Sequence, residues 1–120
     1  MDANCTLSEL KDLVRQFCED RDWDQYHNPK ELAVGIITEA AELLEQFRFL
    51  NDDQMAELLA DANRKRNVED ELADVLFFVL RFSQRFDIEL SEAVQRKIEA
   101  NSLKYPVEKS KGRNLKYTDL

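Results

Sequence analysis

The sequence predicts an all-α protein, a four-helix bundle formed by residues 1–120 as a single domain. The chain has only two glycines and two prolines in 120 residues, which leaves few turn-forming residues for a β-sheet. Charged residues make up 35% of the chain and hydrophobic residues 43%. This composition, rich in Leu, Ala, Glu and Lys, is typical of packed helices rather than of a disordered chain.

The first two helices are predicted from their N-terminal caps. Thr6 and Glu9 have the spacing of a capping box, and apolar residues follow them at helical period. A polar and aromatic connector, "RDWDQYHNP", comes next. Asn28 as N-cap and Pro29 at the first helical position predict the start of the second helix, which we expect to continue to about Phe47.

The second half of the chain predicts two more helices and a tail. A short helix is possible around Gln54 to Ala60, and a long one is predicted from about Asn67 to Phe86. The fourth helix, from about Ser91 to Ser102, is stopped by Pro106. Residues from about 103 to 120 form a basic tail. The long third helix is apolar on more than one face, so we expect a homo-oligomer, either a dimer or a tetramer.

The charge of the chain limits which partners are expected, and its cysteines and lack of targeting signals indicate its compartment. A net charge of −8 argues against nucleic acid and against an anionic membrane as partners. Five Lys or Arg and one Glu between Leu103 and Tyr117 give a local +4, which leaves −12 elsewhere. Two cysteines without a CxxC motif, no signal-peptide pattern and no long apolar run predict a reduced, soluble, cytoplasmic protein.

Two pairs of acids interrupt the two most apolar helices. Glu39 and Glu42 lie three residues apart, as do Glu71 and Asp74, so each pair points off one side of its helix about 60° apart. Glu45 lies about 120° from Glu39 and is expected to be a supporting or solvated residue. The apolar residues of the second helix are expected on the side opposite to its acids; they are Leu32, Ile36, Ala40, Leu43, Leu44 and Phe47.

These four carboxylates indicate a metal site. None has a Lys or Arg four residues away, the usual partner on a solvated helix face. Carboxylates that converge need protons or cations, and an all-oxygen set suits Mg²⁺, with Mn²⁺ as a substitute. The single histidine, His27, lies in a predicted loop, which excludes a Glu-x-x-His di-iron site. Because Mg²⁺ commonly shares its ligand shell with phosphates, a phosphate-bearing substrate is expected; a solvated acidic face is the alternative.

The helices that carry these acids resemble a known family. "EAAELLE" followed by "EDELADV" resembles the ExxE…ExxD signature of the all-α nucleotide pyrophosphohydrolases, the MazG-like group. "RDWDQYHNPKELA" and "KYPVEKSKGRNLKYTDL" resemble the dCTP pyrophosphatase branch of that group. The resemblance implies Mg²⁺-dependent hydrolysis of a nucleoside triphosphate to the monophosphate and pyrophosphate, as housecleaning of the nucleotide pool. It implies metal-binding and catalytic roles for Glu39, Glu42, Glu71 and Asp74.

The same resemblance implies where the nucleotide binds. Trp23, Gln25 and His27 match the family's nucleoside-contacting loop. Asn101 and Lys104, within "KIEANSLKYP", resemble the residues of the family's fourth helix near the phosphates.

Three positions depart from the dCTP pyrophosphatase branch and bear on the base. Phe49 stands where that branch has Trp, Phe78 where it has Tyr, and Val14 where it has His. Hydrogen bonds discriminate between bases far better than apolar packing does, so pyrimidine deoxynucleotides such as dCTP are expected without strict selection. The alternatives are the same chemistry on a non-canonical or oxidised nucleotide, and a non-enzymatic helical interaction module.

Overall fold

The computed structural model describes residues 1–120, and all of its regular elements are helices, which confirms the all-α prediction. Residues Met1–Asp87 and Ile88–Leu120 form two compact units, and each is described by itself. None of the helices is both long and apolar enough to cross a bilayer. In chain order the elements are α1 (Leu7–Asp20), the 3₁₀ turn η1 (Asp24–Tyr26), α2 (Pro29–Glu45), α3 (Asp52–Ala60), α4 (Ala62–Arg85), α5 (Leu90–Lys104), α6 (Val107–Ser110) and the 3₁₀ turn η2 (Tyr117–Asp119).

The predicted caps of α1 and α2 are confirmed. The Glu9 amide donates to Thr6 Oγ1 at 3.1 Å, and the Thr6 amide donates to Glu9 Oε2 at 3.3 Å. The Asn28 side chain accepts from the Glu31 amide at 2.8 Å, with Pro29 in the first turn. Each cap satisfies amides that the first turn of a helix leaves without a backbone partner.

The long helix α4 begins earlier than predicted, at Ala62 instead of about Asn67. Asp61 is its N-cap and accepts from the amides of Asn63 and Arg64 at 3.0 and 3.1 Å. The first turn of α4 is polar and exposed, so apolar periodicity alone does not detect it. The short helix expected around Gln54 is present as α3 and is capped by Asn51.

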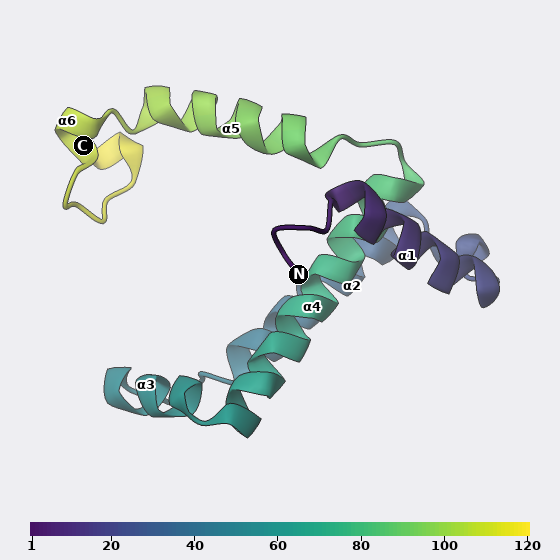
Figure 1. Ribbon diagram of the computed structural model, residues 1–120. Coiled ribbons are helices and arrows are strands. Elements are labelled where there is room, and N and C mark those ends of the chain that lie inside the picture. Colours follow the sequence, from purple (N-terminus) through teal and green to yellow (C-terminus); the bar gives the residue numbers. More distant parts are fainter. The chain divides into compact units, whose positions relative to one another are not determined.

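The first unit is organised around α4. The helices α1, α2 and α3 all pack on it, as Figure 1 shows. Helix α4 is therefore central within this unit. The buried apolar side chains are few for a domain, and they are Val14, Cys18, Leu32, Leu58, Val68 and Leu80.

The contact between α2 and α4 consists of two matched stripes of side chains. Steps of three and four residues keep each stripe on one side of its helix. Gly35 on α2 lies against the Phe78 ring on α4, and the acids of both helices meet further along. The helices are thus antiparallel. The stripes are Leu32, Gly35, Glu39 and Glu42 on α2, and Glu71, Asp74, Phe78 and Arg81 on α4.

The predicted separation of an apolar side and an acidic side on α2 is wrong for Leu32. Leu32 is fully buried and lies two turns before Glu39, so it belongs to the same stripe as the acids. Leu44, which was expected in the core, is 63% exposed, and Ala40 is exposed as well. The core side and the acidic side of α2 are successive segments of one face.

The second unit contains α5 and the C-terminal residues. α5 spans Leu90–Lys104, within two residues of the prediction, and Pro106 follows its end. The residues predicted as a plain basic tail contain α6 and η2. Lys104 Nζ lies 5.0 Å from the centre of the Tyr117 ring, and the Tyr105 and Tyr117 rings meet edge-on at 5.9 Å. The last residues therefore fold back against the end of α5.

The Gly35–Phe78 contact predicts the effect of a single methyl group. A Cβ atom on Gly35 would lie 2.5 Å from the Phe78 ring. Alanine normally stabilises a helix by about 0.5–1 kcal/mol over glycine, but overpacking costs about 1–3 kcal/mol. We expect Gly35→Ala to lower Tm in thermal denaturation and Phe78→Leu to relieve that loss in the double variant.

Thr38→Ala, at an exposed position of α2, is the control and should leave Tm unchanged or slightly higher. An increase in Tm for Gly35→Ala would contradict the close packing of these two helices.

Candidate active site

Three of the four predicted metal ligands lie together between α2 and α4. Glu39 and Glu42 extend from α2 and Glu71 from α4, and one carboxylate oxygen of each lies within 4.8 Å of the others. Glu39 and Glu71 are partly buried, whereas Glu42 is exposed. The stripe pattern brings them together, because Glu39 and Glu42 are one step apart on α2 and face the N-terminal half of α4.

Two oxygens of this cluster lack a hydrogen-bond partner. Glu39 Oε2 and Glu71 Oε2 are buried and neither has one within the chain. Burial raises the pKa of Glu39 above its usual value, and hydrogen bonding to Glu42 and the charges of Glu42, Asp74 and Glu71 raise it further. The pKa of Glu71 is raised by burial, then by hydrogen bonding to Glu42 and the charges of Glu42, Asp74 and Asp70.

The cluster fits a hard divalent cation. Buried polar oxygens are rarely left without partners, and carboxylate oxygens are the ligands that Mg²⁺ and Mn²⁺ prefer. A cation between Glu39, Glu42 and Glu71 would satisfy the two orphaned oxygens. It would also offset the burial and the neighbouring negative charges that raise the pKa of Glu39 and Glu71. The donor set therefore matches the predicted metal class.

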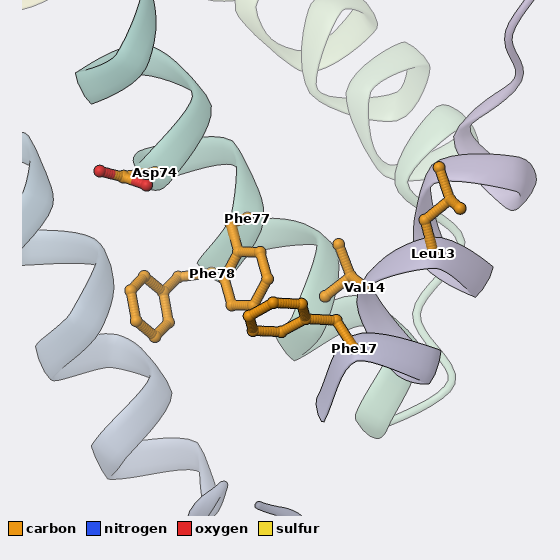
Figure 2. Close-up of a pocket in the computed structure, with 6 residues that line it drawn as sticks. All are labelled: Leu13, Val14, Phe17, Asp74, Phe77 and Phe78. Carbon is orange, nitrogen blue, oxygen red and sulfur yellow. The ribbon is translucent and has the colours of Figure 1, made fainter. Parts of the chain in front are cut away.

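Asp74 joins this cluster to an apolar cavity. It does not belong to the group of oxygens within 4.8 Å of one another, but its charge contributes to the raised pKa of Glu39 and of Glu71. It also lines a cavity of about 460 Å³ between α1 and α4. Figure 2 shows its carboxylate on the same side of α4 as the Phe78 ring, about one helical turn away. The other lining residues are Leu13, Val14, Phe17, Phe77 and Phe78.

The cavity is built from hydrocarbon side chains apart from that one carboxylate. The Phe77 ring meets the Phe78 ring at 5.4 Å and the Phe17 ring at 5.7 Å, both nearly perpendicular. Such edge-to-face pairs hold their rings in fixed orientations. Phe78 was predicted from the sequence as a substrate contact, but Leu13, Phe17 and Phe77 were missed. Their apolar spacing on α1 and α4 indicated only core positions.

The loop before α2 is attached to α4 by an arginine that sequence reasoning also missed. Arg81 is fully buried, and its Nε donates to His27 Nδ1 at 2.8 Å. Its Nη1 donates to Gln84 Oε1 at 2.6 Å, and its Nη2 pairs with the carboxylate of Asp24. Arg85 adds a longer bond of 3.4 Å to the Asp24 carbonyl. The hydrogen bond from Arg81 lowers the pKa of Asp24, and burial followed by the charge of Arg81 lowers that of His27.

The three predicted loop residues have different surroundings. The Trp23 ring meets the Phe17 ring at 5.6 Å and the His27 ring at 6.0 Å, so it lies beside a wall of the cavity. Gln25 is exposed and its amide donates to the carbonyl and carboxylate of Asp22, which stabilises the turn itself. Contact of these residues with a substrate stays a prediction.

The remaining predicted residues lie outside the cavity lining. Phe49 is 88% exposed, with a φ of 66° that is unusual for an aromatic residue, and the Arg48 guanidinium lies over its ring. Asn101 and Lys104 belong to the second unit. Glu45, expected to be supporting or solvated, is exposed and pairs with Arg48 at 3.2 Å.

Residues 34–120 match the MazG-like family, a segment that contains all four acids and the α2–α4 contact. The chain belongs to the MazG-like family. The resemblance noted in the sequence is confirmed.

Curated relatives of this MazG-like protein cover nearly the whole chain. It is 33% identical over 115 residues to dCTP pyrophosphatase 1 of Mus musculus, which covers 96% of this chain and 68% of the mouse protein. The Homo sapiens protein of the same name is 30% identical over the same shares. The crystal structure of a pyrophosphatase from Archaeoglobus fulgidus aligns with a TM-score of 0.77 and 46% identity, over 82% of this chain and 91% of that one.

These relatives identify the class of reaction. The MazG-like protein is an enzyme, a hydrolase that acts on phosphoric anhydrides. Membership of the family together with the curated relatives supports nucleotide pyrophosphohydrolase activity. The alternative of a non-enzymatic interaction module is therefore excluded.

The repulsion within the acidic cluster predicts that one carboxylate, that of Glu39, limits the stability of the protein when Mg²⁺ is absent. Because the pKa of Glu39 is raised above its unfolded value of 4.5, the folded state holds the proton more tightly. The free energy of unfolding then falls as the pH rises from that value through the raised pKa of the folded state. We expect Glu39→Gln to raise Tm at pH 7 in EDTA by about 2–6 °C.

We also expect Mg²⁺ to raise the Tm of the wild-type protein, and Glu39→Gln to lose most of that increase. Glu45→Gln removes an exposed carboxylate from the same helix and is the control, with little effect in either condition. A lower Tm for Glu39→Gln in EDTA would contradict the cluster's unrelieved repulsion.

Proposed function

We propose that this MazG-like protein is a Mg²⁺-dependent pyrophosphohydrolase of pyrimidine deoxynucleoside triphosphates, with dCTP as the leading candidate. Its products are the nucleoside monophosphate and pyrophosphate, which makes it a housecleaning enzyme of the nucleotide pool. The observation that carries the proposal is the position of Asp74. It borders an apolar, aromatic cavity and also lies within the electrostatic reach of the acidic cluster.

The proposed chemistry follows from the acidic cluster and the apolar cavity, which Asp74 links. Glu39, Glu42, Glu71 and Asp74 are the groups that would hold the metal, and a carboxylate not engaged in that role would take the proton from the attacking water. Bound Mg²⁺ would neutralise the phosphates and lower the pKa of water. Water attack on the α–β anhydride forms one P–O bond, breaks the bond to the bridging oxygen and releases pyrophosphate.

The cavity supports a nucleoside as the organic part of the substrate. Its volume of about 460 Å³ is within the usual range for small-molecule sites. The rings of Phe17, Phe77 and Phe78 offer apolar surface to a base. Base stacking on aromatic side chains contributes about 1–3 kcal/mol per base in nucleic-acid complexes.

The hydrocarbon lining also supports broad selection among pyrimidines. Leu13, Val14 and the three phenylalanines offer no hydrogen-bonding group that would tell cytosine from thymine. A methyl group at the C5 position of the base adds apolar surface in such a cavity. A 5-modified pyrimidine deoxynucleotide is therefore the second candidate substrate.

Purified protein with Mg²⁺ and a panel of nucleotides tests this function. The panel contains dCTP, dTTP, dUTP, 5-methyl-dCTP and an oxidised purine triphosphate. We expect monophosphate and pyrophosphate from the pyrimidines, with kcat/KM values within about 200-fold of one another, the range that apolar pockets achieve. Orthophosphate as the only phosphate product, or no turnover of any nucleotide, would defeat the proposal.

Variants of the proposed metal-binding carboxylates are measured in the same assay. Glu42→Ala and Asp74→Ala should lower kcat/KM by more than about 100-fold, the upper range for mutation of outer-shell partners of a metal site. Glu45→Ala, which removes an exposed carboxylate paired with Arg48, should retain activity within about threefold. Retained activity in Glu42→Ala or Asp74→Ala would refute their roles.

We also propose that the enzyme acts as a homo-oligomer. On α2, Val34, Ile37 and Leu44 form an apolar stripe beside the acidic one, and they are 48%, 69% and 63% exposed. On α4, Leu72 and Leu76 are half exposed. Apolar stripes of this extent on a helix pair with so few buried side chains support association with a second copy.

Ile37→Glu tests this association, because a charge in an apolar interface costs more than it does on a free surface. Light scattering coupled to size exclusion should show the wild-type protein as a dimer or tetramer and Ile37→Glu as a smaller species. Thr38→Glu, at the adjacent exposed position, is the control and should not change the mass. A monomeric wild-type protein would refute oligomerisation.

A further inference from the structure

Arg81 is a fully buried charged side chain at the end of the α4 stripe that carries Glu71 and Asp74. It follows Asp74 by seven residues, which is about two helical turns, so both are on the same side of α4. A buried guanidinium is stable only when its N–H groups have partners, and the loop before α2 supplies two of the three. Those two are His27 Nδ1 and the Asp24 carboxylate.

The hydrogen bond from Arg81 determines the chemical form of His27. A guanidinium is always a donor, so His27 Nδ1 must be an acceptor and carries no proton. A neutral imidazole then has its proton on Nε2. Nε2–H is directed away from Arg81, because the two ring nitrogens lie on different sides of the imidazole.

The Asp24 carboxylate gives this arrangement its second anchor. It is 43% exposed and pairs with the buried Arg81 Nη2, while Gln84 on the same helix accepts from Nη1. Arg81 thus contacts two positions of the loop, three residues apart, and fixes the loop in both position and orientation.

The loop that Arg81 holds reaches the cavity through aromatic contacts. His27 meets Trp23 at 6.0 Å, and Trp23 meets Phe17 at 5.6 Å. Phe17 lines the cavity beside Asp74. Movement of the loop would therefore move the Trp23 ring relative to the cavity wall.

We infer that Arg81 is a positioning residue for nucleotide binding: it holds the 23–27 loop against α4 and fixes His27 as the neutral Nε2–H tautomer, an N–H donor for an oxygen of the nucleotide. Arg81 itself does not touch the substrate. The nucleotide part of this inference rests on the proposed function, whereas the tautomer part does not.

The single histidine of the chain makes the tautomer directly measurable. In the ¹⁵N-labelled wild-type protein, long-range ¹H–¹⁵N spectra should show one imidazole, with an unprotonated Nδ1 and a protonated Nε2. Arg81→Lys should lose this signature, because lysine cannot reproduce the planar guanidinium that contacts His27, Asp24 and Gln84 together. An Nδ1–H tautomer, or a doubly protonated imidazole at pH 7, in the wild-type protein would overturn the inference.

Kinetics test the consequence for the nucleotide. Arg81→Lys should raise the KM for dCTP about tenfold, the usual effect of losing one hydrogen bond to a ligand, with kcat within about threefold. A purely structural role would instead lower the amount of active enzyme and leave KM unchanged. Arg64→Lys, in the exposed first turn of α4, is the matched control and should leave KM and the His27 spectrum unchanged.

The two measurements separate the outcomes. A changed tautomer in Arg81→Lys with an unchanged KM overturns the positioning role. If Arg81→Lys does not fold, the wild-type spectrum still decides the tautomer. Asp24→Asn then replaces it as the kinetic test, because it removes the charge of the Asp24 carboxylate that pairs with Arg81. This variant should raise the KM for dCTP and keep the His27 Nε2–H, and an unchanged KM overturns the positioning role. If the wild-type enzyme hydrolyses no nucleotide, the proposed function fails, while the spectrum still tests how Arg81 holds His27.

Discussion

The close approach of α2 to α4 at Gly35 is the constraint on which the rest of the first unit depends. The missing side chain lets the Phe78 ring lie directly on the α2 backbone. With that contact in place, the stripe residues on either side of it face one another in register. On one side they are carboxylates, and on the other side they are Leu32 and the buried Arg81. One packing contact therefore aligns the acidic cluster, the aromatic wall and the anchored loop.

The acidic cluster lowers the stability of the folded protein while no cation is bound. Carboxyl groups with raised pKa values and unpartnered buried oxygens destabilise a folded protein when no cation is present. The few buried apolar side chains leave little surplus to offset that cost. Metal binding and association with other copies would both add to this margin by mass action. The proposed metal binding and the proposed assembly would thus both compensate for the same small core.

Much of the fold and of the candidate site could be predicted from sequence because the signals are local. Capping residues defined the starts of α1 and α2, and unpaired acids three residues apart defined three groups that meet in space. The start of α4 was missed because its first turn is polar. Leu32 was placed on the wrong side, although its seven-residue spacing to Glu39 already indicated a common face.

The features that could not be predicted from the sequence depend on contacts between distant segments. A lone arginine among apolar residues gives no indication that it will be buried, and its partners Asp24 and His27 are more than fifty residues away. The seven-residue step from Asp74 to Arg81 was the available signal. The apolar cavity was likewise missed, because Phe17 and Phe77 come from different helices and each has ordinary core spacing.

The matched stripes of α2 and α4 have a consequence for how such a chain can change in length during evolution. Deleting or inserting one residue within Leu32–Glu42 or Glu71–Arg81 rotates everything beyond it by about 100° and moves one half of the cluster away from the other. Substitutions can accumulate at the positions between the stripe residues of these two segments, but changes in length cannot. The connection through α3 lies outside both stripes, so its length is free to vary, and natural insertions should be concentrated there.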